Sequence, residues 1–204
     1  AAYRAAEAVT VVSSDLEANI TAKVADLGRI PVVETIPNFV DIDNLRPLDR
    51  LTDYRREYCL GDRIVVMYAG NIGHSQSLVV FLAAARRHRH RDDLVYVVNG
   101  GGVRAEEMDA AAADLPNLTV VGYQPAERLA EVLATGDIHV VPLRTGLAVA
   151  SVPSKAYSVL AAGRPIIASV DRDTELVRIV TEAAAGQAVP PDALDAFTTA
   201  SEPL

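Results

Sequence analysis

From Arg63 onward, short runs of apolar residues alternate with longer stretches in which apolar side chains recur every three or four positions. The runs are typical of buried strands and the stretches of amphipathic helices. The runs predict strands at 64–69, 94–98, 118–121, 138–142, 166–168 and 187–189. The stretches predict helices at about 75–88, ending near 114, from 125, across 153–163 and from 174. This alternation indicates an α/β fold, a Rossmann-like doubly wound parallel sheet.

The first 60 residues follow a different pattern. Strands are expected at 8–12 and 31–36, around a helix that begins at Ser13 to Asp15 and is ended by Gly28. These two strands, lying outside the main sheet, could pair with each other, extend that sheet, or pair with another copy of the chain. A polar, irregular stretch follows them, with a short helix expected at about 49–58.

Composition divides the chain into three parts. We expect 1–36 to be the remnant of a preceding domain, 37–60 to be an interdomain linker, and 61–204 to be the main domain. The chain opens in what reads as the middle of a helix. We therefore expect it to be a piece of a longer protein.

The segment 151–169 carries the clearest candidate chemistry. Ser151 or Ser154 could cap a short helix, Pro153 suits its first turn, and Gly163 supplies its C-terminal cap. A helix N-terminus exposes N–H groups and a positive dipole end, and Lys155 adds a cation there. The combination favours an anion, most simply a phosphate. The alternative is an ordinary helix–strand unit whose lysine faces solvent.

Overall composition removes several classes of function. Half of the 204 residues are apolar, and the net charge of −8 argues against nucleic acid as a partner. The single cysteine, Cys59, suits a reducing compartment. No residues stand at metal-ligand spacing, and no run is long enough to span a membrane. We expect a cytoplasmic protein without a metal or a separate cofactor.

Glycine motifs narrow the choice of nucleotide. Gly70 and Gly73 follow the first strand of the main domain, where glycine lets a ligand approach the backbone. The dinucleotide fingerprint is absent, and Asn99 stands where an acidic residue would bind a ribose. The Walker A motif is absent as well. What remains is a nucleotide diphosphate, held by backbone amides and few charges; an NAD-dependent oxidoreductase is disfavoured.

Several motifs occur together in a familiar order. They are 37–41 (PNFVD), 66–76 (VMYAGNIGHSQ), 152–155 (VPSK), 161–165 (AAGRP), 175–177 (ELV) and 186–192 (GQAVPPD). Over about residues 5–195 the chain resembles the donor-binding C-terminal half of a retaining glycosyltransferase of the GT-B fold, family 4. Within that family it is similar to bacterial enzymes of colanic-acid, O-antigen and exopolysaccharide assembly.

The resemblance implies a donor that is a nucleotide-diphosphate sugar, commonly UDP-linked, and an acceptor that is a glycan or a lipid-linked molecule. It implies that 1–36 is the remnant of the acceptor-side domain and that 61–204 is the Rossmann-like domain that binds the nucleotide-sugar donor. It implies that Lys155 neutralises the diphosphate and stabilises the leaving group. Backbone amides over Gly70 to Gly73 and at Pro153 and Ser154 would face the diphosphate. The implied donor-binding residues are Gly70, Asn71, Ile72, Gly73, Gln76, Asn99, Gly100, Gly101, Gly122, Tyr123, Pro153, Ser154, Lys155, Ser158 and Glu175.

The sequence also departs from the family. Many members carry two glutamates eight residues apart, and the corresponding positions here are Ala150 and Ser158. The catalytic residues therefore stay unassigned. A GT-B-fold epimerase or hydrolase and a non-catalytic nucleotide-binding module remain as alternatives.

The segment 86–91 (RRHRHR) is a basic run at a helix end, which the helix dipole accounts for. The alternative interpretation is peripheral contact with an anionic membrane surface, which would suit a lipid-linked acceptor. The oligomeric state stays open.

Overall fold

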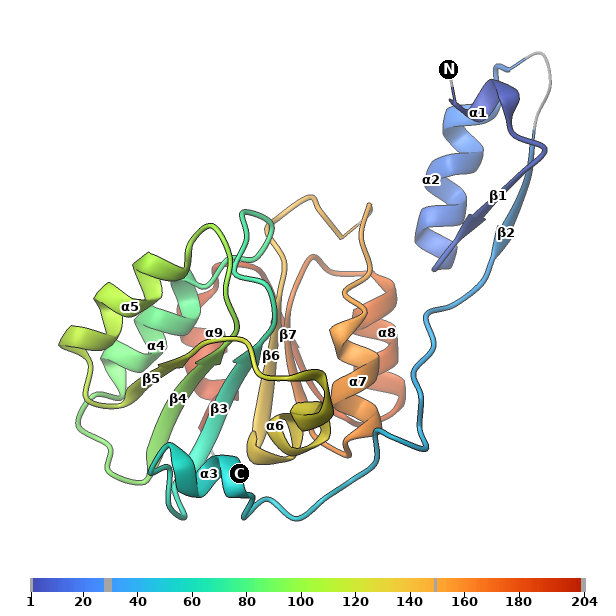
Figure 1. Cartoon of the computed structure of the whole chain (residues 1–204). Coiled ribbons are helices and arrows are strands. Elements are labelled where there is room, and N and C mark those ends of the chain that lie inside the picture. The colour runs from blue at the N-terminus through green and yellow to red at the C-terminus, as the bar shows by residue number, and fades with distance from the viewer. Residues whose placement is uncertain (1, 28–30, 149, 203–204) are drawn as a thin grey trace.

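The computed structural model describes residues 2–27, 31–148 and 150–202. These residues form two separate parallel sheets, a two-stranded one near the N-terminus and a six-stranded one from residue 64 onward. A segment without helix or strand, 36–52, connects them (Figure 1). The small sheet and its helices, coloured blue in Figure 1, stand beside the main domain.

The main sheet has the strand order of the Rossmann fold. Its strands are β3 (Ile64–Ala69), β4 (Leu94–Asn99), β5 (Leu118–Val121), β6 (Ile138–Pro142), β7 (Ile166–Ser169) and β8 (Gly186–Val189). They lie in the order β5-β4-β3-β6-β7-β8, which is 3-2-1-4-5-6 when counted along the chain. The predicted doubly wound parallel sheet is confirmed. Its strand order reverses between β3 and β6.

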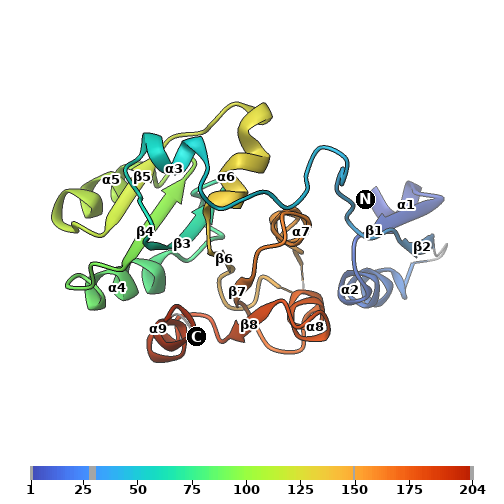
Figure 2. The ribbon, with the colours of Figure 1, turned by 90° about the horizontal axis from the view of Figure 1, so that it is seen from below.

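Helices cover both faces of this sheet. The helices are α3 (Asp53–Glu57), α4 (Val79–Arg87), α5 (Ala105–Asp114), the 3₁₀ turn η1 (Ala126–Arg128) with α6 (Leu129–Thr135), α7 (Lys155–Ala161), α8 (Glu175–Glu182) and α9 (Leu194–Ala200). Helices α4, α5 and α9 share a core with one face, and α3, α6, α7 and α8 pack on the other. Seen from below, α4 and α9 lie opposite α3 and α6 (Figure 2).

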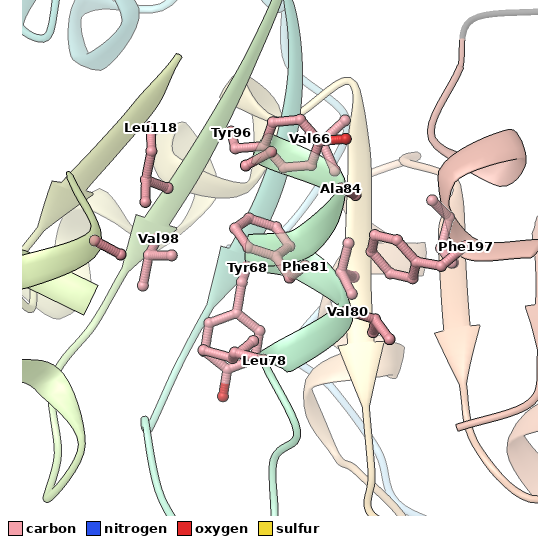
Figure 3. Close-up of a cluster of buried hydrophobic side chains, with 14 of the residues drawn as sticks. Val66, Tyr68, Leu78, Val80, Phe81, Ala84, Tyr96, Val98, Leu118 and Phe197 are labelled. Atoms are coloured by element: carbon pink, nitrogen blue, oxygen red, sulfur yellow. The ribbon is translucent and has the colours of Figure 1, made fainter. Parts of the chain in front are cut away.

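Alternation along the strands produces the two cores. On β3, Val66 and Tyr68 join one hydrophobic cluster, while Val65 and Met67 join the other. Figure 3 shows the first cluster, in which the ring of Phe81 from α4 meets Tyr96 of β4 edge to face, with 5.1 Å between ring centroids. Both faces of each central strand are therefore buried, as its uninterrupted apolar run predicts.

The N-terminal unit is a small βαβ motif. It comprises α1 (Ala2–Ala5), β1 (Ala8–Val11), α2 (Ser14–Val24) and β2 (Val32–Thr35). Strands β1 and β2 pair with each other in parallel, which selects the first of the three alternatives for them. Ile20 and Val24 of α2 cover the pair, and the Ser13 hydroxyl caps α2 by accepting from the N–H of Leu16 at 3.2 Å. Gly28, the expected helix stop, lies outside the described residues.

Some predicted boundaries are wrong. The helix predicted from residue 75 begins at Val79, because 71–78 is a loop held by side chains: Gln76 Oε1 accepts from the N–H of Gly73, and Ser77 donates to Asp192. Helix α9 was not predicted, since its seven residues carry a weak apolar pattern. Within the described part of the chain, no helix combines the length and the apolarity needed to cross a membrane.

Candidate functional site

The candidate site lies beside the point where the strand order reverses, at the carboxyl ends of β3, β4 and β5. A cavity of about 260 Å³ opens there between α6 and α7. Open α/β sheets bind ligands at this position, because the loops after neighbouring strands diverge. Five of the predicted site residues line the cavity, namely Gly70, Asn99, Tyr123, Lys155 and Ser158.

Lys155 is the centre of this site. Its ammonium nitrogen is buried, has no hydrogen-bond partner among the described residues, and lies 3.9 Å from the ring centroid of Tyr68. Burial lowers the pKa of Lys155 to about 8. The alternative of a solvent-facing lysine is therefore wrong. A buried cation is costly unless an anion or a polar group satisfies it, so this ammonium is poised for an anionic ligand.

Gly70 brings the backbone directly against that ammonium. Its φ is +139°, and a Cβ at this position would lie 2.9 Å from Lys155 Nζ. Only glycine meets both conditions without strain. The tip of β3 and the first residue of α7 thus form one compact unit.

Asn99 and Tyr123 form the side of the cavity toward β4 and β5. Asn99 is buried and its Oδ1 accepts from the hydroxyl of Tyr54 at 2.8 Å. The Tyr123 hydroxyl donates to the carbonyl of Gly101 at 2.9 Å, so the exposed aromatic ring lies over that glycine. Burial raises the pKa of Tyr54, which keeps the phenol protonated as the donor. Tyr54 fixes the Asn99 amide in one orientation.

Three of the four amides predicted to face a diphosphate in the loop after β3 donate within the protein. The N–H groups of Gly70, Ile72 and Gly73 donate to Asn99 O, Gly101 O and Gln76 Oε1. These three donors are used within the protein, and the prediction that the amides of Gly70 to Gly73 face a diphosphate stays a prediction. Asn71 accepts from the Tyr68 hydroxyl through its carbonyl, and Gln76 closes the loop. These residues shape the loop that lies against Gly100 and Gly102.

The turn before α7 does retain unused donors. Among the described residues, the N–H groups of Ser154 and Lys155 have no acceptor. Ser154 occupies the N-cap position as predicted, but its side chain makes no capping hydrogen bond, and neither Ser151 nor Pro153 replaces it. The donors and the Lys155 ammonium belong to the same turn.

Ser158 connects the cavity with a second hollow. A hollow of about 690 Å³, lined by Ser158, Leu129 and residues 39–41 and 44–45, adjoins the first and shares Ala126 with it. Ser158 and Leu129 line both hollows. Gly122 has open space around its Cα, whereas Glu175 does not line the cavity, because its carboxylate pairs with Arg178 at 2.9 Å.

Several lining residues were missed from the sequence. Gln124 and Pro125 follow β5, and Leu129, Val132 and Leu133 form the apolar wall on α6. Their apolar spacing indicates only a helix that packs inward. Tyr54 was missed because it lies 45 residues before its partner Asn99, in a region expected to be a linker.

A six-stranded parallel sheet in the order 3-2-1-4-5-6 defines a Rossmann-like domain, the type of domain that GT-B glycosyltransferases contain. Residues 63–204 match the family described as "Glycosyl transferases group 1", and the chain belongs to that family.

Two curated relatives agree with this assignment. The chain is 32% identical over 137 residues to WcaI of Escherichia coli (strain K12), described as a colanic acid biosynthesis glycosyl transferase, covering 67% of this chain and 32% of WcaI. It is 26% identical over 198 residues to WbjE of Pseudomonas aeruginosa, described as a glycosyltransferase, covering 93% of this chain and 47% of WbjE. The chain thus spans from about a third to about half of the length of these relatives.

Solved structures share the fold. Sucrose-phosphate synthase from Thermosynechococcus elongatus superposes with a TM-score of 0.77 at 22% identity, over 97% of this chain and 49% of that one. HepE of Anabaena, solved in complex with UDP-glucose, superposes with a TM-score of 0.74 at 16% identity, over 97% of this chain and 54% of that one.

Proposed function

We propose that the whole protein transfers a sugar, with retention, from a UDP-linked donor to a glycan or lipid-linked acceptor in cell-surface polysaccharide synthesis. The 204 residues supply the donor-binding half and bind the nucleotide without transferring the sugar. Membership of the group 1 glycosyltransferases supports the reaction type, and the names of WcaI and WbjE support the pathway class. The complex of HepE with UDP-glucose supports the donor.

The observation that carries this proposal is the buried Lys155 ammonium near the switch point of the sheet, which has no hydrogen-bond partner among the residues that the structure describes. A diphosphate placed there receives the ammonium charge and the N–H groups of Ser154 and Lys155. Charge-assisted hydrogen bonds of this kind are about twice as strong as neutral ones. The donor needs no metal in this arrangement, since a lysine and a helix start share the neutralisation.

The remaining cavity residues suit a nucleoside. The walls are mainly apolar, from Leu129, Val132 and Leu133, and Asn99 and Gln124 supply a small number of polar groups. Small-molecule sites typically combine apolar walls with few polar groups that fix orientation. The phosphates then point toward Lys155 and the base lies between α6 and the tip of β5. During transfer, negative charge grows on the departing diphosphate, and Lys155 stabilises it.

UDP and UDP-sugars should raise the melting temperature of the chain, because they bind the native state. At about a hundred times Kd the stabilisation is about 2.7 kcal/mol. For a chain of this size that corresponds to an increase of about 5 to 10 °C in Tm. The measurement is a thermal-shift series with UDP-, GDP-, ADP- and TDP-sugars, with NAD as the control. A response to NAD alone would contradict the proposal.

The affinity for UDP should fall as the pH rises above 8. In the free protein Lys155 is charged below its pKa of about 8 and neutral above it. Binding an anion favours the charged form, so the association constant is nearly constant below pH 7.5 and falls by up to about tenfold per pH unit above pH 8. Calorimetric titrations between pH 6.5 and 9.5 measure this slope. The variant Lys155→Met should lack it, while Lys23→Met, at the chain's other lysine, should keep it.

A non-catalytic nucleotide-binding module is the second candidate. The observation in its favour is that Ala150 and Ser158 replace the two family glutamates. An activity assay on the whole protein separates the two functions, because a binding module binds UDP without turning over UDP-sugars.

A further inference from the structure

Helix α8 begins with a hydrogen bond that its own sequence does not supply. Its N-cap residue, Thr174, makes no side-chain capping bond, since its hydroxyl donates to the Asp171 carbonyl instead. The N–H of Glu175 donates to Asp15 Oδ2 at 2.7 Å, from a residue 160 positions earlier in the chain. The cap comes from α2 of the N-terminal unit.

The second oxygen of Asp15 is used on the same helix turn. Asp15 Oδ1 lies 2.8 Å from Arg178 Nη2, which also contacts Glu175 at 2.9 Å and the Ser14 hydroxyl at 3.3 Å. The side chain of Asp15 is 20% exposed and that of Arg178 is 39% exposed. These hydrogen bonds to Asp15 and Glu175 raise the pKa of Arg178. The Asp15 carboxylate thus accepts from the Glu175 N–H and from the Arg178 guanidinium.

The arrangement solves an electrostatic problem. Helices α2 and α8 approach each other with their N-terminal ends (Figure 1), and both ends carry a partial positive charge. Left unscreened, the two ends would repel each other. Asp15 lies in the first turn of α2 and caps the first turn of α8, so its negative charge is shared by both. Removing that charge weakens the attraction between the two helix ends.

The contact between the starts of α2 and α8 lies close to the candidate site. A small cavity of about 10 Å³ is lined by Glu175 together with residues 151–153, the turn that leads into Lys155. A hollow of about 370 Å³ brings Ala150 together with residues of β1 and α2. The N-terminal unit therefore rests on the loop before α7. The connecting segment 36–52, which has no helix or strand, does not by itself fix that position.

We propose that Ser14, Asp15, Glu175 and Arg178 form an interdomain clasp that holds the N-terminal unit closed against the nucleotide-binding domain. The partner surface for the start of α8 is thus the start of α2 in the same chain. Closing the clasp places the N-terminal unit beside the turn that carries Lys155, and opening it separates them. The clasp needs no ligand, so it holds whether or not the chain binds UDP.

The clasp is tested by measuring the distance between the two units. Spin labels on the native, exposed Cys59 and on Lys23→Cys, at an exposed position of α2, report this distance by double electron–electron resonance. The parent chain should give one narrow distribution. Asp15→Ala should broaden it, raising the ratio of open to closed chains about 5- to 30-fold, as expected for the loss of one charge-assisted contact. Asp15→Asn keeps an acceptor for the Glu175 N–H and should lie between them.

Matched variants make the test decisive. Asp26→Asn and Arg172→Gln make the same charge changes at exposed positions of each unit and should leave the distribution narrow. A decrease in helical circular dichroism would show that Asp15→Ala also unfolds part of α2. In that case the distance distribution of Arg178→Gln, which leaves the sequence of α2 unchanged, is the test of the clasp. Distributions for Asp15→Ala and Arg178→Gln that match the parent would overturn the clasp. High salt should broaden the parent distribution, because partly exposed ion pairs are screened.

Discussion

Replacing Lys155 with Met is expected to lower the affinity for UDP while raising the stability of the ligand-free chain. The ammonium makes a charge-assisted contact with the diphosphate, and such contacts contribute about 1.5–3 kcal/mol. The Kd for UDP should therefore increase about 10- to 100-fold. The ammonium is buried without a hydrogen-bond partner in the described residues, so the isosteric, neutral methionine removes a cost. We expect the free energy of unfolding to rise by about 0.5–2 kcal/mol.

The opposite signs of these two effects distinguish a binding residue from a structural one. If Lys155 only supported the fold, replacing it would lower both the affinity for UDP and the free energy of unfolding. Isothermal calorimetry with UDP and urea unfolding of the free chain measure the two effects separately. Lys23→Met removes the same charge from the exposed surface of α2 and should change neither. Equal UDP affinity for Lys155→Met and the parent chain would remove Lys155 from the site.

The strands of the main sheet could be predicted from sequence because both of their faces are buried. Runs such as 64–69 have no polar interruption, so the run predicts the strand, and alternation with helices predicts the parallel order. The position of Lys155 at a helix start followed from local signals, namely Pro153 before it and Gly163 after it. Elements that are determined by neighbouring residues in the chain can therefore be predicted from the sequence.

Contacts between distant segments could not be predicted. Tyr54 orients Asn99, and Asp15 caps α8, yet each pair lies far apart in the chain. A sequence shows which groups need partners, but the topology decides which ones they meet. The same limit applies to the amides of Gly70 to Gly73, three of which donate to acceptors within the protein. Their glycines were interpreted as places where a ligand approaches. The structure instead places the Lys155 side chain against Gly70 and the Asn71 and Gln76 side chains against Gly73, and a close backbone approach occurs at Gly100.

Gly100 is the clearest case of that approach, and Gly100→Ala is expected to be strongly destabilising. A Cβ on Gly100 would lie 1.9 Å from the carbonyl oxygen of Gly70, and the φ of Gly100 is +152°. Neither the added Cβ nor the Gly70 carbonyl oxygen can move by rotation of a side chain, so the steric clash can be relieved only by a shift of the backbone. Backbone strain of about 1–3 kcal/mol and overpacking of about 1–3 kcal/mol together predict a loss of about 3–5 kcal/mol.

The same substitution should also reduce UDP binding, because the relief it requires moves the tips of β3 and β4 apart. Gly70 lies against Lys155, and Asn99 precedes Gly100, so the displacement reaches both sides of the cavity. Gly122→Ala is the matched control, since a Cβ there meets nothing within 4 Å. Urea unfolding and UDP calorimetry of the two variants make the comparison. A Gly100→Ala chain as stable as Gly122→Ala would show that the strand tips tolerate separation, and the close approach of Gly70 and Gly100 would then not be what shapes the site.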